Sequence, residues 1–276
     1  MDILTALPDD LVISLLMEWL LLHDVCCLDS ALCVKKGRPS FLRILQSPQV
    51  KLIAQAPWNE TDIPNWLQWI TVRNIHLEEL HISLSTLDPF MGPLTEALLH
   101  LPTLQRLILN GNDLGAAGAA SISQVLPQLP NLQRLYLGDN DLFAAGAASL
   151  CQSLPQLLNL QELHLAGNTI GAEGAASLCP VLPHLLNLQR LNLGNNAIGT
   201  AGAASLCQVL PQLLNLHILD LGHNGIGAAG AASLCHALPQ LLNLQILFLG
   251  VNDIGEEATA SVRQALVHLP NLRMFL

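Results

Sequence analysis

Residues 132–159, LQRLYLGDNDLFAAGAASLCQSLPQLLN, decide the fold, because the chain repeats this stretch with a period of 28 residues. Copies begin at Leu104, Leu132, Leu160, Leu188, Leu216 and Leu244, and a stub begins at Leu272. A degenerate copy precedes them, with Leu77, Leu80 and Ile82 at its first apolar positions. A fixed period of this length is typical of a protein that stacks one small unit many times.

Each copy has two halves with different periods. In the first half, Leu135 and Leu137 alternate with other residues, which predicts a short strand with one buried face. In the second half, Gly146, Leu150 and Leu154 follow at intervals of four, which predicts a helix with one apolar stripe. A recurring proline is expected to end that helix, and the glycines to allow tight packing of helix on strand. Since one unit cannot bury its own apolar face, neighbouring units must share a core.

An asparagine stands between the strand and the helix of every full copy. The column comprises Asn112, Asn140, Asn168, Asn196, Asn224 and Asn252. An amide side chain both donates and accepts hydrogen bonds, and a chain that turns inside a core leaves backbone groups that need partners. We therefore interpret the column as structural, with each amide bonding the turn of its own repeat and of the next.

The repeat resembles a known family. In the copy from Leu188 the family pattern is carried by Leu188, Leu191, Leu193, Asn196, Ile198, Gly202, Leu206 and Leu210. This order is similar to leucine-rich repeats of the ribonuclease-inhibitor type, and the resemblance covers residues 77–276. It implies an α/β solenoid of horseshoe shape, with parallel strands inside and helices outside, that binds proteins without being an enzyme. Similar repeats form the ligand-sensing ends of NOD-like receptors and the body of Ran GTPase-activating proteins.

The copies differ most at their third, fifth and eighth positions. Alternation along a strand points positions three and five away from the core, and position eight lies at the rim. The candidate partner-binding residues are therefore Arg106, Arg134, Tyr136, Asp139, Glu162, His164, Arg190, Asn192, Asn195, Asp220, His223 and Phe248. Six strands about 4.8 Å apart make a face roughly 29 Å wide, which suits a protein partner. Drift after duplication is the alternative, although exposed helix positions have not diverged equally.

The first part of the chain differs from the repeats, and all four tryptophans lie there. We divide the chain into an F-box-like helical segment (1–50), a connecting or capping helix (51–76) and the solenoid (77–276). Residues 7–33 resemble an F-box, the helical element that binds the Skp adaptor of cullin ubiquitin ligases. On that resemblance the adaptor contact would comprise Leu7, Pro8, Leu11, Leu15 and Leu16. A generic all-α cap over the first repeat is the alternative.

Composition limits the classes of partner and chemistry. The formal net charge is −10, and from Arg73 onward thirteen acidic side chains outnumber six basic ones, which disfavours nucleic acid and anionic membranes. The apolar run 11–22 is too short to span a bilayer and follows acidic residues, so we expect a cytoplasmic protein, with the nucleus as alternative. Ten histidines lack metal-ligand spacing, and we expect no metal, cofactor or catalytic site. Cysteines recur every 28 residues and are expected as small buried side chains: Cys151, Cys179, Cys207 and Cys235.

Three functional hypotheses remain open at this point. The first is a substrate-recruiting adaptor of a cullin-type ubiquitin ligase, and the second is a plain scaffold or inhibitor-like binder. The third is a GTPase-activating protein, for which Arg73 and Arg106 are the candidate arginines. Residues 272–276 form a final strand whose open edge would accommodate a second copy or a partner, unless the gene is truncated.

Overall fold

The computed structural model describes residues 52–55, 63–73, 76–84 and 86–276. The F-box-like segment, with Leu7, Pro8, Leu11, Leu15 and Leu16, lies outside these residues. The expected N-terminal all-α unit, its adaptor contact and the domain boundary at residue 50 therefore stay predictions.

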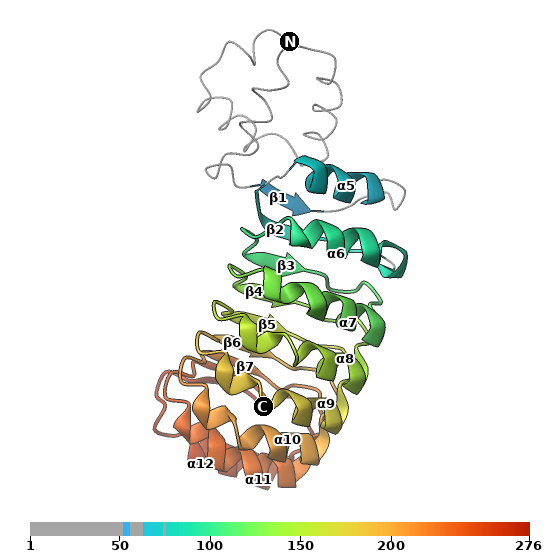
Figure 1. Ribbon diagram of the computed structural model, residues 1–276. Coiled ribbons are helices and arrows are strands. Elements are labelled where there is room, and N and C mark those ends of the chain that lie inside the picture. The colour runs from blue at the N-terminus through green and yellow to red at the C-terminus, as the bar shows by residue number, and fades with distance from the viewer. Residues whose placement is uncertain (1–51, 56–62, 74–75, 85) are drawn as a thin grey trace.

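The described residues form one parallel sheet of nine strands, paired in sequence order, and the helices pack against one face of this sheet (Figure 1). The strands are β1 (Leu52–Gln55), β2 (Leu77–His81), β3 (Arg106–Ile108), β4 (Arg134–Tyr136), β5 (Glu162–His164), β6 (Arg190–Asn192), β7 (Ile218–Asp220), β8 (Ile246–Phe248) and β9 (Arg273–Phe275). The helices are α5 (Ile63–Arg73), α6 (Met91–Leu99), α7 (Gly115–Val125), α8 (Phe143–Leu150), α9 (Gly171–Leu178), α10 (Gly199–Cys207), α11 (Gly227–Ala237) and α12 (Gly255–Ala265). This confirms the predicted solenoid.

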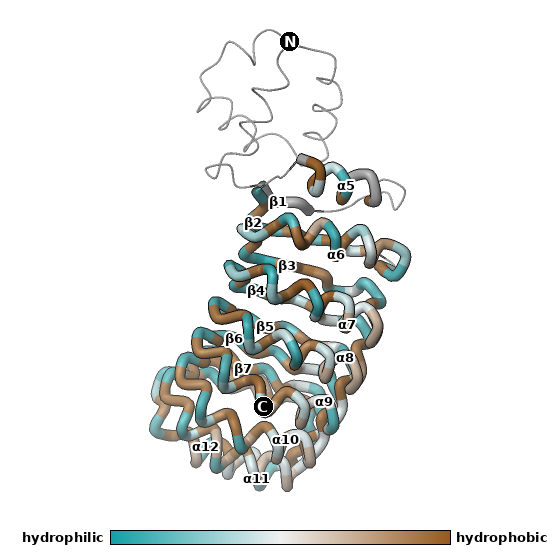
Figure 2. Tube along the Cα trace, viewed as in Figure 1, coloured by the Kyte–Doolittle hydropathy of each residue, from teal (hydrophilic) through white to brown (hydrophobic). Residues whose placement is uncertain are grey.

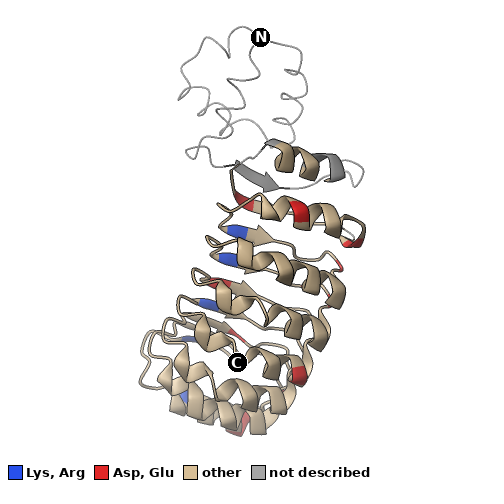
Figure 3. Cartoon of the chain, viewed as in Figure 1, with Lys and Arg blue, Asp and Glu red and all other residues tan. Residues whose placement is uncertain are grey.

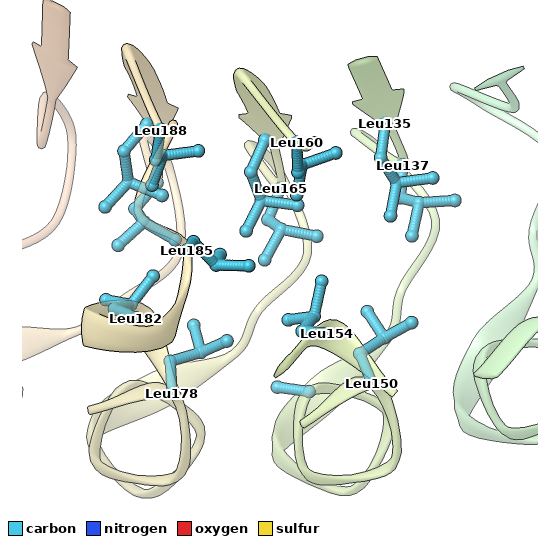
Figure 4. Close-up of a cluster of buried hydrophobic side chains, with 14 of the residues drawn as sticks. Leu135, Leu137, Leu150, Leu154, Leu160, Leu165, Leu178, Leu182, Leu185 and Leu188 are labelled. Carbon is cyan, nitrogen blue, oxygen red and sulfur yellow. The ribbon is translucent and has the colours of Figure 1, made fainter. Parts of the chain in front are cut away.

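The core lies between the strands and the helices along the whole stack. Because the copies have equal length, the central leucines pair in register from strand to strand, as Leu135 does with Leu163 and Leu163 with Leu191. These side chains are at most 1% exposed. Figure 4 shows strand-side leucines such as Leu135 and Leu137 on the side of the core opposite the helix leucines Leu150 and Leu178. Strands lie about 4.8 Å apart and helices about 8–10 Å apart, so the strand side is the concave side.

The sheet begins one strand before the repeats that we counted from Leu77. Strand β1 pairs in parallel with β2, and helix α5 follows it and contacts α6. Residues 51–76, where we expected only a helix, thus contain a strand and a helix. The reason is that a run of four residues is too short to show a period, whereas its pairing with β2 depends on the neighbouring unit.

The helices end earlier than the leucine spacing predicts. Helix α8 ends at Leu150, and Leu154 instead opens a short 3-10 turn, Leu154–Gln156, with Pro155 in it. Similar 3-10 turns follow α7 and α9 to α11: Leu126–Gln128, Leu182–His184, Leu210–Gln212 and Leu238–Gln240. Another, Asp88–Phe90, precedes α6. Proline fits the first turn because its missing N–H has no partner there in any case. The recurring proline therefore shapes the return to the next strand rather than simply terminating the α-helix.

The asparagine column is structural, as the sequence predicts. The amide of Asn168 donates to the carbonyl groups of Leu137 and Leu165 at 2.8 and 2.9 Å. Its Oδ1 accepts from the backbone N–H groups of Asn140 and Leu142 at 3.0 and 3.4 Å. The side chain therefore reaches back to the preceding repeat, not to the following one, and it is fully buried.

A second asparagine ladder follows the 3-10 turns, which sequence analysis overlooked although it has the same period. Its members are Asn131, Asn159, Asn187, Asn215 and Asn243. Each amide donates to a carbonyl group of the preceding repeat, as Asn187 does to Leu158 at 2.8 Å. These asparagines are exposed, so each bond stabilises the stack less than one in the buried column.

Four helical glycines, Gly146, Gly174, Gly202 and Gly230, serve close contact between neighbouring helices, which corrects our expectation of helix–strand packing. A Cβ atom added at Gly202 would lie 2.4 Å from Cγ2 of Ile198 in its own repeat. It would also lie 3.2 Å from the backbone of Ala172 and 3.2 Å from Cβ of Ala175, in the preceding helix. Any side chain at this position would therefore push α10 away from α9.

The repeated cysteines are free and only half-buried, beside the core rather than inside it. Burial raises the pKa of Cys151 and of Cys207 to about 11, so both thiols are protonated at neutral pH. Burial also raises the pKa of Cys179 and Cys235. Protonated thiols are poor nucleophiles and poor metal ligands, which agrees with a packing role for this column.

Candidate protein-binding face

The concave face carries two parallel rows of side chains that run across the strands. The row of fifth positions pairs residue by residue from β3 to β8: Ile108, Tyr136, His164, Asn192, Asp220 and Phe248. The row of third positions lies beside it: Arg106, Arg134, Glu162, Arg190, Ile218 and Ile246. Both rows face away from the core because the leucine between them points inward. The structure thus brings nine of the twelve candidate residues onto one surface.

Glu162 is the centre of the charged part of this face. Its Oε1 lies 3.1 Å from Nε of Arg134 and 3.7 Å from Nη1 of Arg190. Its Oε2 accepts a hydrogen bond from the hydroxyl group of Tyr136 and lies 3.7 Å from Nε2 of His164. The contact with Arg134 is an ion pair without the alignment of a hydrogen bond. Since Glu162 is only 7% exposed, its carboxylate interacts with these four neighbours rather than with a partner.

Two aromatic side chains contact the carboxylate of Glu162. The rings of Tyr136 and His164 stack with their centroids 4.2 Å apart. The pKa of Tyr136 is raised to about 12, mainly by burial and in addition by the hydrogen bond and the negative charge of Glu162. Burial lowers the pKa of His164, against the opposing effect of Glu162, so its imidazole is neutral at pH 7. The pair is therefore a neutral, rigid aromatic surface between arginines.

A second ion pair lies at the N-terminal end of the face. Arg106 Nη1 is 2.6 Å from Glu79 Oε2, and Glu79 is 8% exposed. Sequence analysis missed Glu79, although it occupies the third position of the degenerate copy from Leu77. This pairing also bears on the GTPase-activating hypothesis, because Arg106 is held on the strand face and not in a loop. The side chain of Arg73 lies outside the described residues.

Part of the variation in the fifth row has a structural cause. The amide oxygen of Asn192 accepts a hydrogen bond from the backbone of Gly194 at 2.9 Å. The carboxylate of Asp220 accepts one from the backbone of Gly222, also at 2.9 Å. Both side chains thus cap the end of their own strand, which leaves less of their polar capacity for a partner.

The eighth positions form the rim, and each has a left-handed backbone. Their φ angles lie between 53° and 69°: Gly111, Asp139, Gly167, Asn195, His223 and Val251. Glycine, asparagine and aspartate adopt this conformation most readily, which explains Asp139 and Asn195 without a partner. Val251 is the exception, because a β-branched residue is strained there and its side chain is 68% exposed. Asp139, Asn195 and His223 are exposed at this rim and take no part in the Glu162 cluster.

Aliphatic and aromatic side chains are concentrated in the C-terminal part of the face. Ile218 and Ile246 occupy the third row where the preceding strands carry charges. The ring of Phe248 stacks on that of Phe275 in β9 with centroids 4.6 Å apart. Phe275 is half exposed, and sequence analysis did not include it in the face. The third row therefore changes from charged on β2 to β6 to apolar on β7 and β8, and charged residues remain nearby at Asp220 on β7 and Arg273 on β9.

Two other features are absent from the part of the chain that the structure describes. No group of three or more histidine, cysteine, aspartate or glutamate side chains there is arranged to hold a metal ion. Within the same residues, no helix combines the length and the apolar character that crossing a bilayer requires.

The repeated part of the chain is similar to known proteins. A family model described as Leucine Rich repeat matches residues 100–123, 156–179, 184–207 and 212–235. Among solved structures, the chain is similar to a leucine-rich-repeat protein of Leptospira interrogans, with 21% identity, a TM-score of 0.41, and coverage of 87% of this chain and 68% of that one. It is also similar to LegL7 of Legionella pneumophila, a leucine-rich repeat-containing protein, with 20% identity, a TM-score of 0.44, and coverage of 81% of this chain and 79% of that one. A third similar structure is a Bacteroides fragilis protein, with 14% identity, a TM-score of 0.49, and coverage of 90% of this chain and 70% of that one. No curated protein sequence matches the chain.

Proposed function

We propose that this solenoid of leucine-rich repeats is a protein-binding module whose ligand lies on the concave strand face. The Glu162 cluster carries the proposal, because it holds Arg134 and two aromatic rings beside the more exposed Arg190 on an open surface. Tyrosine and arginine provide much of the binding energy in protein interfaces. Side chains that are already held in place lose little conformational entropy when a partner binds.

The dimensions of the face also favour a protein ligand. The varied rows cross six strands, which corresponds to a width of roughly 29 Å. A cavity of about 540 Å³ lies at the C-terminal end of the face, where the chain enters β8 and β9, and its lining includes Ile246 and Arg273 but no member of the Glu162 cluster. The cluster itself is therefore part of an extended surface, which suits a macromolecule better than a small molecule.

The direct test is capture of partners from native cell extract by the purified full chain. The variant Tyr136→Ala/His164→Ala/Asp220→Ala should lose the proteins that the natural chain retains. A matched triple variant, Gln128→Ala/Gln156→Ala/Gln212→Ala, changes exposed residues of the 3-10 turns and should retain them. Equal capture by the inner-face variant and the natural chain would contradict the proposal.

A narrower form of the proposal is a substrate-recruiting adaptor of a cullin-type ubiquitin ligase, acting in the cytoplasm or nucleus. It is supported by the F-box resemblance of residues 7–33. Co-purification with a Skp-type adaptor, lost in Leu11→Asp/Leu15→Asp, tests it. If residues 1–76 are only a cap, as in a plain scaffold or inhibitor-like binder, that variant leaves partner capture on the concave face unchanged.

A further inference from the structure

We infer that the concave face recognises a short acidic segment of its partner that also carries an apolar side chain. The inference rests on the proposed function and specifies the chemistry of the ligand. Three observations support it: where the arginines lie, how their charges are paired, and how the face changes character along the stack.

The arginines are concentrated on the concave face of an acidic protein. After Arg73 the chain has five arginines, and four of them, Arg106, Arg134, Arg190 and Arg273, occupy the third row. Of the thirteen acidic residues in the same stretch, three lie in the two inner rows: Glu79, Glu162 and Asp220. Figure 3 shows most of the blue segments on the strand side of the stack. The face is thus more positive than the protein that carries it.

Among the arginines of β3, β4 and β6, the pairing of charges leaves the guanidinium group of Arg190 the most available. Arg106 and Glu79 form a close pair, but Arg134 and Arg190 share the single carboxylate of Glu162. Arg190 is the farther of the two, at 3.7 Å, and its side chain is 51% exposed. Asp220 on the next strand is the nearest further acid in these rows, and its carboxylate already accepts from Gly222. A carboxylate from a partner would pair with the guanidinium group of Arg190, because a guanidinium group can donate two parallel hydrogen bonds to one carboxylate.

The rim restricts the length of an anionic ligand. Asp113, Asp139 and Asp141 are exposed at the turns that follow β3 and β4. A nucleic acid that crossed the solenoid would bring its phosphates close to these carboxylates and be repelled. A short acidic segment that lies along the rows avoids them, so the charge pattern favours a peptide over a polyanion.

The apolar end of the face sets the second requirement. Arg190 and Ile246 are two strands apart in one row, which is about 10 Å. An extended peptide rises about 3.3 Å per residue, so about three residues span this distance. Ile218, Ile246 and Phe248 are partly exposed and form an apolar surface there (Figure 2 shows the hydropathy along the chain). The ligand should therefore carry an aspartate or glutamate about three residues from an aliphatic or aromatic side chain.

The test is selection from a phage-displayed library of random peptides of about twelve residues, roughly 40 Å when extended. The immobilised full chain should enrich peptides with that acidic–apolar spacing. A selected peptide is then synthesised, and its Kd is measured by fluorescence anisotropy. The variant Arg190→Glu should weaken binding at least about tenfold, because a carboxylate now faces the acidic residue of the peptide.

The control is Arg263→Glu, which makes the same charge change at an exposed position of α12, outside the face. It should change the Kd less than about twofold, and binding to the natural chain should weaken as salt is added. Selection of basic or uncharged peptides, equal effects of the two variants, or no peptide that depends on the face would each overturn the inference. Partner capture that still depends on Tyr136, His164 and Asp220 would leave the proposed function standing.

Discussion

The hydroxyl group of Tyr136 donates a hydrogen bond to the carboxylate of Glu162, which lies on the neighbouring strand in the following repeat. The two residues occupy different positions of their repeats, so the contact is a diagonal across the sheet. It links the aromatic row to the charged row, and it makes Glu162 the residue on which the geometry of the face depends.

Glu162→Gln should lower the pKa of Tyr136 from about 12 toward, but not to, the ordinary value near 10. The charge of Glu162 contributes to the rise, but burial is its largest cause and remains in the variant. Tyr136 is the only tyrosine in the chain, so ultraviolet absorbance of tyrosinate reports it alone. Because its folded pKa lies above its unfolded one, ionisation destabilises the fold as pH rises from 10 to 12, and circular dichroism must show that the repeats remain folded.

Asp220→Asn is the matched control for that titration. It makes the same carboxylate-to-amide change on the same face and preserves the cap on Gly222, as Asn192 does for Gly194. The pKa of Tyr136 should stay near 12 in this variant. A titration that Glu162→Gln does not shift would show that Glu162 is not the partner of Tyr136 in solution.

Asn168→Ala should lower the free energy of unfolding by about 3 kcal/mol or more, because it removes the partners of several buried backbone groups. Asn187→Ala in the exposed ladder loses one hydrogen bond to Leu158, and its cost should be about 1 kcal/mol or less. Urea denaturation measures both. Equal costs would mean that the buried column has no special structural weight.

Gly202→Ala tests the close contact of α10 with α9. Alanine in a helix gains about 1 kcal/mol over glycine, but overpacking against Ile198 and Ala172 costs about 1–3 kcal/mol, so the net effect should be destabilising. Gly92→Ala in α6 is the control, since nothing beyond its chain neighbours lies within 4 Å of its added Cβ, and it should destabilise less than Gly202→Ala. A rise in Tm for Gly202→Ala would refute the packing role.

Val251→Asn should raise the free energy of unfolding by about 1 kcal/mol. The substitution removes a β-branched residue from a backbone with a φ of 56°, which asparagine adopts more readily. Little buried apolar surface is lost, because Val251 is 68% exposed. The reverse change, Asn195→Val at the equivalent position, where φ is 53°, should destabilise by a similar amount. Thermal unfolding of both variants measures the pair, and shifts of the same sign would argue against strain.

The sequence was sufficient to predict the features that depend on the period. The strands, the leucine core and the asparagine column follow from spacing alone, because identical units must pair in register. Strand β1 could not be predicted in the same way, since four residues show no period and its place depends on pairing with β2. The start of the sheet was therefore placed one strand too late.

The candidate face was predicted as rows of residues but not as a network. Alternation places Glu162 on the outward side of β5, yet it is buried because side chains from β4 and β6 close over it. Such burial depends on which side chains occupy the adjacent strands and on their rotamers, which spacing does not determine. The backbone at the eighth position likewise explains Asp139 and Asn195, which sequence comparison attributed to a partner.

Site-specific photo-crosslinking from the concave face tests the central claim most directly. A benzophenone side chain is introduced at Ile246 on the face or at Gln156 on the outer 3-10 turn, and the chain is irradiated in native extract. The account predicts that the crosslinker at Ile246 forms an adduct with a partner. An excess of the natural chain should prevent this adduct by competition, whereas an excess of the Tyr136→Ala/Phe248→Ala variant should not. Adducts from Gln156 alone, or equally from both positions, would contradict binding on the concave face.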